Sequence, residues 1–291
     1  MTPLDFAFLR RLLKGRSGLD LSADKGNLVE ERLLPLARCE GFDGIDDLIR
    51  ALRADDHRLI GCVVEAMTTN ETFFFRDKTP FDDLREIIIP ALLQSRASRR
   101  SLRIWSSACS TGQEPYSIAM CLNEFGAQLA GWHVEILATD ISEAVLARSQ
   151  LGIFSHFEVQ RGLPIHLLLK YFTQVGETLT GKAWQANPEL RAMVTHRPFN
   201  LLHDVTPLGT FDVIFCRNVM IHFDADTKTS LFARLAGALE TDGALALGGA
   251  ETAVGLTDAF KPHPDGRGLY RRELRSPSLA TRLSPFKVVA R

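Results

Sequence analysis

A loop of small residues is the stretch of the sequence best suited to hold a ligand. The apolar run 102–105 is typical of a buried strand, the small residues of 106–112 follow it, and Pro115 suits the first turn of a helix. Small side chains let a ligand approach the backbone at the carboxyl end of a parallel strand. The loop holds a single glycine, so it lacks the GxGxxG pattern and disfavours a pyrophosphate. A tight turn without a ligand is the alternative.

An acidic residue follows the next strand-like run. Residues 134–138 are mostly apolar, and Asp140 comes shortly after them. An acidic side chain at this place accepts hydrogen bonds from ribose hydroxyls. Alternatively, Asp140 opens the turn before a helix that begins near Ser142. We favour the ribose because the small-residue loop lies upstream. A ligand with a ribose but no pyrophosphate indicates S-adenosylmethionine.

Both features lie where strand-like and helix-like stretches alternate. Such alternation predicts an α/β fold with a mostly parallel, doubly wound sheet. Residues 160–195 interrupt the rhythm with short segments between glycines and a proline, which predicts a small antiparallel β insertion. The expected strands are 102–105, 134–138, 211–216 and 244–247, and the expected helices are 115–125, 143–149 and 226–239.

The first part of the chain carries no strand signal. Phe6, Leu9 and Leu13 recur at helical spacing, and three more apolar helical stretches follow them. We therefore expect an all-α N-terminal domain. The predicted organisation is a helical domain over 1–66, a linker and signature segment over 67–100, the α/β domain over 101–274 and a flexible tail over 275–291.

Composition excludes several classes of protein. Of the 291 residues, 45% are hydrophobic and 24% are charged, so the chain is neither disordered nor collagen-like. Its 34 Lys and Arg nearly balance 35 Asp and Glu, which disfavours nucleic-acid binding through a global basic field. There is no apolar run long enough for a membrane span and no signal-peptide pattern at the start. Five scattered cysteines without a CxxC pair suggest reduced thiols in the cytoplasm and no structural zinc.

Three motifs in this order resemble the CheR family of chemotaxis receptor methyltransferases, and the resemblance covers nearly all of residues 5–273. Residues 67–76 (MTTNETFFFR) are similar to the segment that joins the two domains of that family. Residues 110–117 (STGQEPYS) resemble its cofactor loop, and residues 211–221 (FDVIFCRNVMI) resemble its fourth-strand motif. The resemblance implies a Rossmann-like class I methyltransferase domain behind the helical one.

The resemblance also implies the reaction and its site. The activity would be methyl transfer from S-adenosylmethionine to glutamate side chains of receptor helices, giving glutamyl methyl esters and S-adenosylhomocysteine without a metal. Taken one at a time, some of the residues that would line the site have simpler alternative roles: a helix cap, an acidic residue in the first turn of a helix, or a turn residue. The residues implied at the cofactor are Asn70, Thr72, Arg76, Glu114, Asp140, Asn200, Leu201, Arg217 and Asn218.

The reaction needs no general base, because a glutamate is already ionised at neutral pH. We expect Arg76 to be catalytic by orienting a carboxylate, either that of the substrate or that of the cofactor. His222 stands where the family usually has tyrosine. It would either help to place the methyl group, with a pH dependence near neutrality, or act as a neutral spacer.

The implied partners are methyl-accepting chemotaxis receptors, with no nucleic acid and no membrane insertion, and the chain is expected to be a monomer. The β insertion could bind a C-terminal receptor peptide by strand addition. A basic cluster in the helical domain could meet an acidic receptor helix: Arg10, Arg11, Lys14 and Arg16. Two other functions stay open, a non-catalytic sensor of S-adenosylmethionine and a methyltransferase with another protein or small-molecule substrate.

Overall fold

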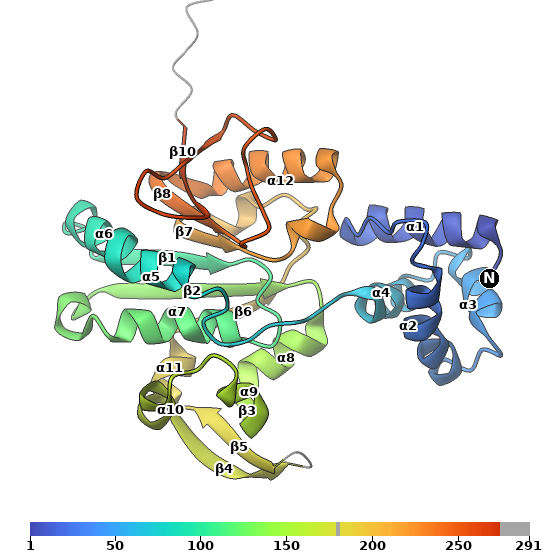
Figure 1. Cartoon of the computed structure of the whole chain (residues 1–291), viewed down its shortest axis with the longest axis horizontal. Helices are drawn as coiled ribbons and strands as arrows, with labels where there is room; N and C mark the ends of the chain where they lie inside the picture. Colours follow the sequence, from blue (N-terminus) through green and yellow to red (C-terminus); the bar gives the residue numbers. More distant parts are fainter. Residues whose placement is uncertain (179–180, 274–291) are drawn as a thin grey trace, which may run out of the picture.

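The computed structural model describes residues 1–178 and 181–273, a helical N-terminal domain beside a larger α/β domain (Figure 1). The predicted flexible tail, residues 275–291, lies outside the described residues. Within the described part, no helix is both long and apolar enough to cross a membrane.

The N-terminal domain has a hydrophobic core of its own. Thr2 and Asp5 form a capping box that begins the first helix, and left-handed Gly18 ends it. Leu9, Leu33 and Ile49 from three of the helices are fully buried together. The domain consists of α1 (Pro3–Ser17), α2 (Gly26–Cys39), α3 (Ile45–Leu52) and α4 (His57–Met67).

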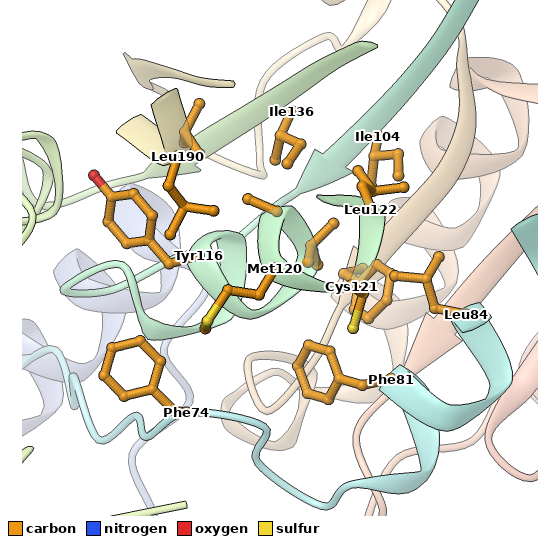
Figure 2. Packing of buried hydrophobic residues seen from close by; sticks show 14 of the residues in the cluster. Phe74, Phe81, Leu84, Ile104, Tyr116, Met120, Cys121, Leu122, Ile136 and Leu190 are labelled. Carbon is orange, nitrogen blue, oxygen red and sulfur yellow. The ribbon is translucent and has the colours of Figure 1, made fainter. Parts of the chain in front are cut away.

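The segment expected as a linker belongs to the α/β domain instead. It forms α5 (Thr79–Asp83), a π-helical turn (Leu84–Ile88) and α6 (Ile89–Ser95). Figure 2 shows α7 (Gln113–Asn123) lying between side chains of the sheet and the side chains of Phe74 and Phe81. Packing on both faces explains why nearly all of α7 is buried, including its polar residues.

The main sheet has seven strands in the order β6-β2-β1-β7-β8-β10-β9. The strands from β6 to β8 pair in parallel, and β10 pairs antiparallel with both β8 and β9. The chain order reverses direction between β1 and β7, which is the point where such sheets open a crevice for ligands. The strands are β1 (Ser101–Ser106), β2 (His133–Asp140), β6 (Val194–Pro198), β7 (Phe211–Cys216), β8 (Leu239–Leu247), β9 (Phe260–Pro262) and β10 (Leu269–Arg272).

The expected strands and helices of this domain all form with shifts of at most two residues at their ends, except that β8 begins at Leu239 instead of at residue 244. Two further helices that the sequence predicted are α8 (Glu143–Leu151) and α12 (Ala225–Ala238). Short 3-10 turns connect other elements: Gly126–Leu129, Thr206–Leu208 and Met220–His222.

The β insertion exists, but its bounds differ from the expected 160–195. The small antiparallel sheet has the order β3-β5-β4, with β3 (Ile153–Ser155), β4 (Phe172–Thr178) and β5 (Gly181–Ala186). It therefore begins before residue 160, while Val194 already belongs to the main sheet. A three-residue strand followed at once by a helix cap carries too little alternation to be seen in the sequence. The accompanying helices are α9 (His156–Gln160), α10 (Ile165–Tyr171) and α11 (Pro188–Ala192).

Candidate functional site

A cavity opens at the carboxyl ends of β1, β2 and β7 and is closed on one side by the N-terminal domain. Together with its opening to solvent, the cavity encloses about 970 Å³ of space. Every residue predicted from the sequence as catalytic or cofactor-binding lines this cavity: Asn70, Thr72, Arg76, Glu114, Asp140, Asn200, Leu201, Arg217, Asn218 and His222.

The small-residue loop wraps around the carboxylate of Asp140. One carboxylate oxygen accepts the N–H of Ser110 at 2.9 Å, and the other accepts the N–H of Ser142 at 3.0 Å. Each oxygen keeps a lone pair for another donor. Burial raises the pKa of Asp140, while the backbone N–H groups oppose that rise. Asp140 thus both orders the loop and offers two acceptors to a ligand with adjacent hydroxyls.

Gly112, the single glycine of the loop, is required by packing. Its φ is +101°, and an added Cβ would lie 3.1 Å from the Cα of Ser149 and collide with the Ser149 hydroxyl. The loop can therefore pass between β1 and α8 only with glycine at this position. This close approach brings the loop backbone to the cavity, as its small residues predicted.

Glu114 and Arg217 form a buried pair in the cavity wall. Glu114 accepts the hydroxyl of Ser106 at 2.7 Å and one N–H of Arg217 at 2.9 Å. Arg217 also donates to the backbone carbonyl of Arg76 at 2.6 Å and to Asp77 at 2.9 Å. Both Glu114 oxygens are thus engaged within the protein. Its contribution to the site is to hold Arg217, which in turn holds the segment around Arg76.

That segment is strained. Phe75, Asp77 and Lys78 all have positive φ, at 52°, 67° and 47°. Such left-handed residues other than glycine cost energy and concentrate at functional sites. Arg217 holds the segment from one side, and the Ser117 hydroxyl, which accepts the N–H of Phe75 at 3.0 Å, holds it from another. The surrounding structure therefore fixes the backbone that carries Arg76.

The plainer roles considered for Asn70 and Thr72 are wrong, whereas that of Asn200 is right. Asn70 and Thr72 lie between α4 and α5 and cap neither helix. Asn200 does form a turn, because its side-chain oxygen accepts the N–H of Leu202 at 2.9 Å. Its amide donates to the carbonyl of Arg16 at 2.7 Å, which attaches the loop after β6 to the end of α1.

The N-terminal domain supplies part of the cavity, which the sequence did not indicate. Ser17, the last residue of α1, and Leu19, just after the helix, line it. The N–H of Asp20 donates to the carbonyl of His222 at 2.8 Å. An added Cβ on Gly18 would lie 2.9 Å from the ring of Phe223, another cavity residue. The end of α1 is therefore packed directly on the loop after β7.

The basic cluster of α1 is largely neutralised within the protein. Only Arg11 among its members makes no ion pair with the residues that the structure describes. The pairs are Arg10 with Asp20, Lys14 with Asp224 and Arg16 with Asp55. Most of the positive charge expected to meet an acidic helix is thus already compensated.

Arg76 and His222 face the cavity from different elements. Arg76 donates to the backbone carbonyl of Glu71 at 2.6 Å and lies over the ring of Phe73. The remaining N–H groups of its guanidinium can serve a carboxylate. Burial lowers the pKa of His222, so its imidazole is neutral at neutral pH. The site therefore combines one fixed cation with a neutral, partly buried ring.

Comparison with known proteins identifies the family. Residues 70–267 match the model described as the CheR methyltransferase SAM binding domain, and residues 4–68 match the CheR methyltransferase all-alpha domain. The chain belongs to the CheR methyltransferase family. The resemblance carried by the three sequence motifs is thereby confirmed, as are the Rossmann-like fold, the all-α N-terminal domain and the S-adenosylmethionine-dependent methyltransferase activity class.

Curated relatives extend over most of the chain. A chemotaxis protein methyltransferase of Pseudomonas aeruginosa is 38% identical over 262 residues, covering 88% of this chain and 93% of the relative. One from Pseudomonas putida is 38% identical and covers 89% of this chain and 94% of its own length. One from Vibrio cholerae is 37% identical over 254 residues, with 86% and 90% covered.

The cavity of this CheR methyltransferase fits S-adenosylmethionine in its polarity. Asp140 presents acceptor positions on both carboxylate oxygens to a ligand in the cavity. Leu201 and Phe199 supply an apolar part of the cavity wall. Among the described residues, no group of three or more His, Cys, Asp or Glu side chains could hold a metal ion.

Glu251 is a functional residue that the sequence analysis missed. Its carboxylate accepts four backbone N–H groups, those of Gly248, Asn218, Val219 and Met220, at 2.7–3.0 Å. Asn218 has a φ of 57°, and this turn carries Arg217 and His222 into the cavity. The sequence did contain a signal, because an acidic residue stands shortly after the Gly-Gly pair that follows the β8 run. However, three of the four N–H groups that this acid accepts lie about thirty residues earlier.

Proposed function

We propose that this enzyme transfers the methyl group of S-adenosylmethionine to glutamate side chains of methyl-accepting chemotaxis receptors. The products would be glutamyl methyl esters and S-adenosylhomocysteine, formed in the cytoplasm for sensory adaptation. One observation carries the proposal: a single cavity holds both an acceptor for a ribose, Asp140, and a fixed guanidinium for a carboxylate, Arg76. The names of the curated relatives, chemotaxis protein methyltransferases, support the same substrate class.

The residues of the cavity suit transfer between a carboxylate and a sulfonium. The bound cofactor supplies an electrophilic methyl group, so no proton has to be removed from an ionised glutamate. Arg76 orients the carboxylate through its planar N–H groups. The electron pair of the carboxylate oxygen forms the new O–CH3 bond, and the pair of the S–CH3 bond stays on sulfur. The protein contributes alignment and the exclusion of water.

His222 acts in this proposal as a neutral contact beside the reacting groups. Its lowered pKa means that it adds no positive charge next to a sulfonium at neutral pH. Of the two roles considered for it, the spacer is therefore the one we propose at neutral pH. Its carbonyl holds Asp20, so it also links the reacting end of the cavity to the N-terminal domain.

The test combines binding with transfer. Titration calorimetry measures the affinity for S-adenosylmethionine and S-adenosylhomocysteine, and tritiated methyl transfer to receptor-containing membranes measures the reaction. We expect micromolar-range binding and a base-labile label on the receptors, since a methyl ester hydrolyses in base whereas a methylated amine does not. Arg76→Ala should abolish most of the transfer while the chain stays folded.

The outcomes separate the alternatives. Binding without transfer to any receptor would indicate a sensor of the cofactor. A base-stable label, or label on another protein or a small molecule, would indicate a different substrate. Absence of binding would contradict the assignment of the cavity itself.

A further inference from the structure

Two guanidinium groups flank one phenylalanine beside the cavity. Arg161 lies over the ring of Phe73 at 4.5 Å from its centre, and Arg76 lies over the same ring at 5.6 Å. Cation–π contacts of this kind hold guanidinium groups in place without consuming their N–H donors. Arg76 lines the cavity, and the exposed Arg161 pairs with Glu71, another residue of the lining, so Arg161 lies at the edge of the cavity.

The position of Arg161 is built into the backbone. The next residue, Gly162, has a φ of +87°, and an added Cβ would collide with the carbonyl oxygen of Phe74. The corner between α9 and α10 is therefore packed directly on the strained segment that carries Arg76. Only glycine at position 162 allows this approach, which sets Arg161 beside Phe73.

The guanidinium of Arg161 forms an ion pair with a carboxylate of the protein itself. Glu71 accepts an N–H of Arg161 at 2.6 Å, and the two side chains are 55% and 44% exposed. An ion pair this exposed is weak, so another carboxylate can replace it. The pKa of Glu71 is lowered by Arg161 first and by Arg76 second. The rim of the cavity is thus a place where two cations favour an ionised carboxylate.

We propose that Arg161 is a specificity residue that binds an acidic side chain of the protein substrate next to the glutamate being methylated. This inference rests on the proposed function. Arg76, inside the cavity, takes the target carboxylate, and Arg161, at the rim, takes its neighbour after releasing Glu71. On a substrate helix, residues three or four apart lie about 5–6 Å from each other, so one helix face can present both acids.

Two substitutions with opposite effects test this inference. Arg161→Ala should raise the KM for a purified receptor cytoplasmic fragment by roughly three- to fivefold, the size expected for one exposed charge pair. Glu71→Gln removes the competing carboxylate but keeps the carbonyl that holds Arg76, so it should lower that KM by about twofold. In Arg161→Ala we expect kcat and the affinity for S-adenosylmethionine to stay near the values of the unchanged enzyme, whereas Glu71 lines the cavity and its variant is read only by the direction of the change in KM.

Arg148→Ala is the matched control. Arg148 is also an exposed arginine paired with a glutamate, Glu158 at 3.1 Å, but it does not line the cavity or contact Phe73. The KM of Arg148→Ala for the receptor fragment should equal that of the unchanged enzyme. The dependence of KM on salt should also be weaker in Arg161→Ala than in the unchanged enzyme, because one attractive charge is missing.

A receptor fragment in which the acids flanking the target are replaced by glutamine completes the test. On this fragment, the unchanged enzyme and Arg161→Ala should have the same KM. Equal KM values on the unaltered receptor would overturn the role of Arg161 and leave the proposed function standing. Failure of the unchanged enzyme to methylate any receptor would overturn both.

Discussion

Burial of Asp140 gives the proposed binding of a ribose a dependence on pH. The pKa of this carboxyl is raised because burial disfavours its charged form. The ionised carboxylate is the stronger acceptor for two hydroxyls, so a bound ribose would favour the charged form. We expect cofactor affinity to be constant well above the raised pKa and to fall as the pH falls through it.

Calorimetric titration with S-adenosylhomocysteine over a pH series measures this effect. Asp140→Asn should bind more weakly at neutral pH by about 1–3 kcal/mol and should lose the decline on the acid side. Asp204→Asn is the control, since Asp204 is exposed and its carboxylate accepts from Thr206. An acid decline that persisted in Asp140→Asn would assign the titration to another group.

His222 provides a second pH prediction, with a different readout. Burial lowers its pKa below the ordinary value of 6.5, Glu251 opposes that shift, and Arg32 adds to it. The imidazole is neutral at neutral pH and becomes charged only as the pH falls through the lowered pKa. We expect kcat at saturating cofactor to fall over that acid range, because a new cation then faces the sulfonium.

The variant His222→Tyr, which restores the usual residue of the family, should keep its turnover at neutral pH and lose this acid decline in kcat. His203→Tyr is a control on an exposed histidine of the same domain. A decline centred near neutrality in the unchanged enzyme would contradict the neutral role of His222.

The sequence could predict which single residues line the cavity, but it could not predict the contacts that these residues make with one another. The motif residues are contiguous in sequence, so Asn70, Glu114 and Asn218 could be placed from the motifs alone. The pairing of Glu114 with Arg217 spans 103 residues of sequence, and no local pattern encodes it. The sequence around Asn200 likewise indicates a turn, but it does not indicate the hydrogen bond from Asn200 to the carbonyl of Arg16.

Among the secondary elements, length decided what the sequence could show. The strands and helices of the main sheet are long enough to show their periodicity. β3 is three residues long, and the π-helical turn at Leu84–Ile88 precedes Pro90, which lacks an N–H and interrupts the helical pattern. These elements, and the packing of the 67–100 segment on α7, depend on tertiary contacts.

The turn after β7 depends on a single side chain from another element, which gives a third prediction. Replacing Glu251 with alanine leaves four backbone N–H groups without their acceptor. We expect a loss of about 1–3 kcal/mol in the free energy of unfolding. We also expect a weaker affinity for S-adenosylmethionine, because Arg217 and Asn218 are no longer held toward the cavity.

Thermal unfolding and calorimetry together test this role of Glu251. Glu251→Gln, which keeps one acceptor oxygen, should lie between the alanine variant and the unchanged enzyme in both measurements. Glu240→Gln on β8 is the control, since Glu240 forms a partly exposed ion pair with Arg99. Unchanged cofactor affinity in Glu251→Ala would show that the turn holds its shape without this carboxylate.

In the molecule as a whole, the cavity lies where the two domains meet. The helical domain was predictable as a unit with its own apolar periodicity, and Figure 1 shows it at one end of the sheet. The contribution of the helical domain to the cavity was not predictable, because Ser17 and Leu19 belong to no motif. The contacts between the two domains also join residues some 200 positions apart. Cofactor affinity should therefore respond to changes at the domain junction that leave both cores intact.

Gly18 allows this coupling to be measured against a matched control. Gly18 and Gly41 end neighbouring helices with nearly equal φ, +79° and +80°, so alanine strains the backbone alike at both. An added Cβ at Gly41 meets nothing within 4 Å, whereas at Gly18 it meets the ring of Phe223 at 2.9 Å. Each variant should lose about 1–2 kcal/mol of stability from the left-handed strain.

Only Gly18→Ala should also weaken the binding of S-adenosylmethionine, because it pushes α1 away from the loop after β7. Its affinity should fall several-fold, with the far-ultraviolet circular dichroism unchanged and the loss of stability similar to that of Gly41→Ala. Equal affinities in the two variants would mean that the cavity tolerates a shifted N-terminal domain. The ligand site would then belong to the α/β domain alone, and Ser17 and Leu19 would lie at its edge without contributing to cofactor binding.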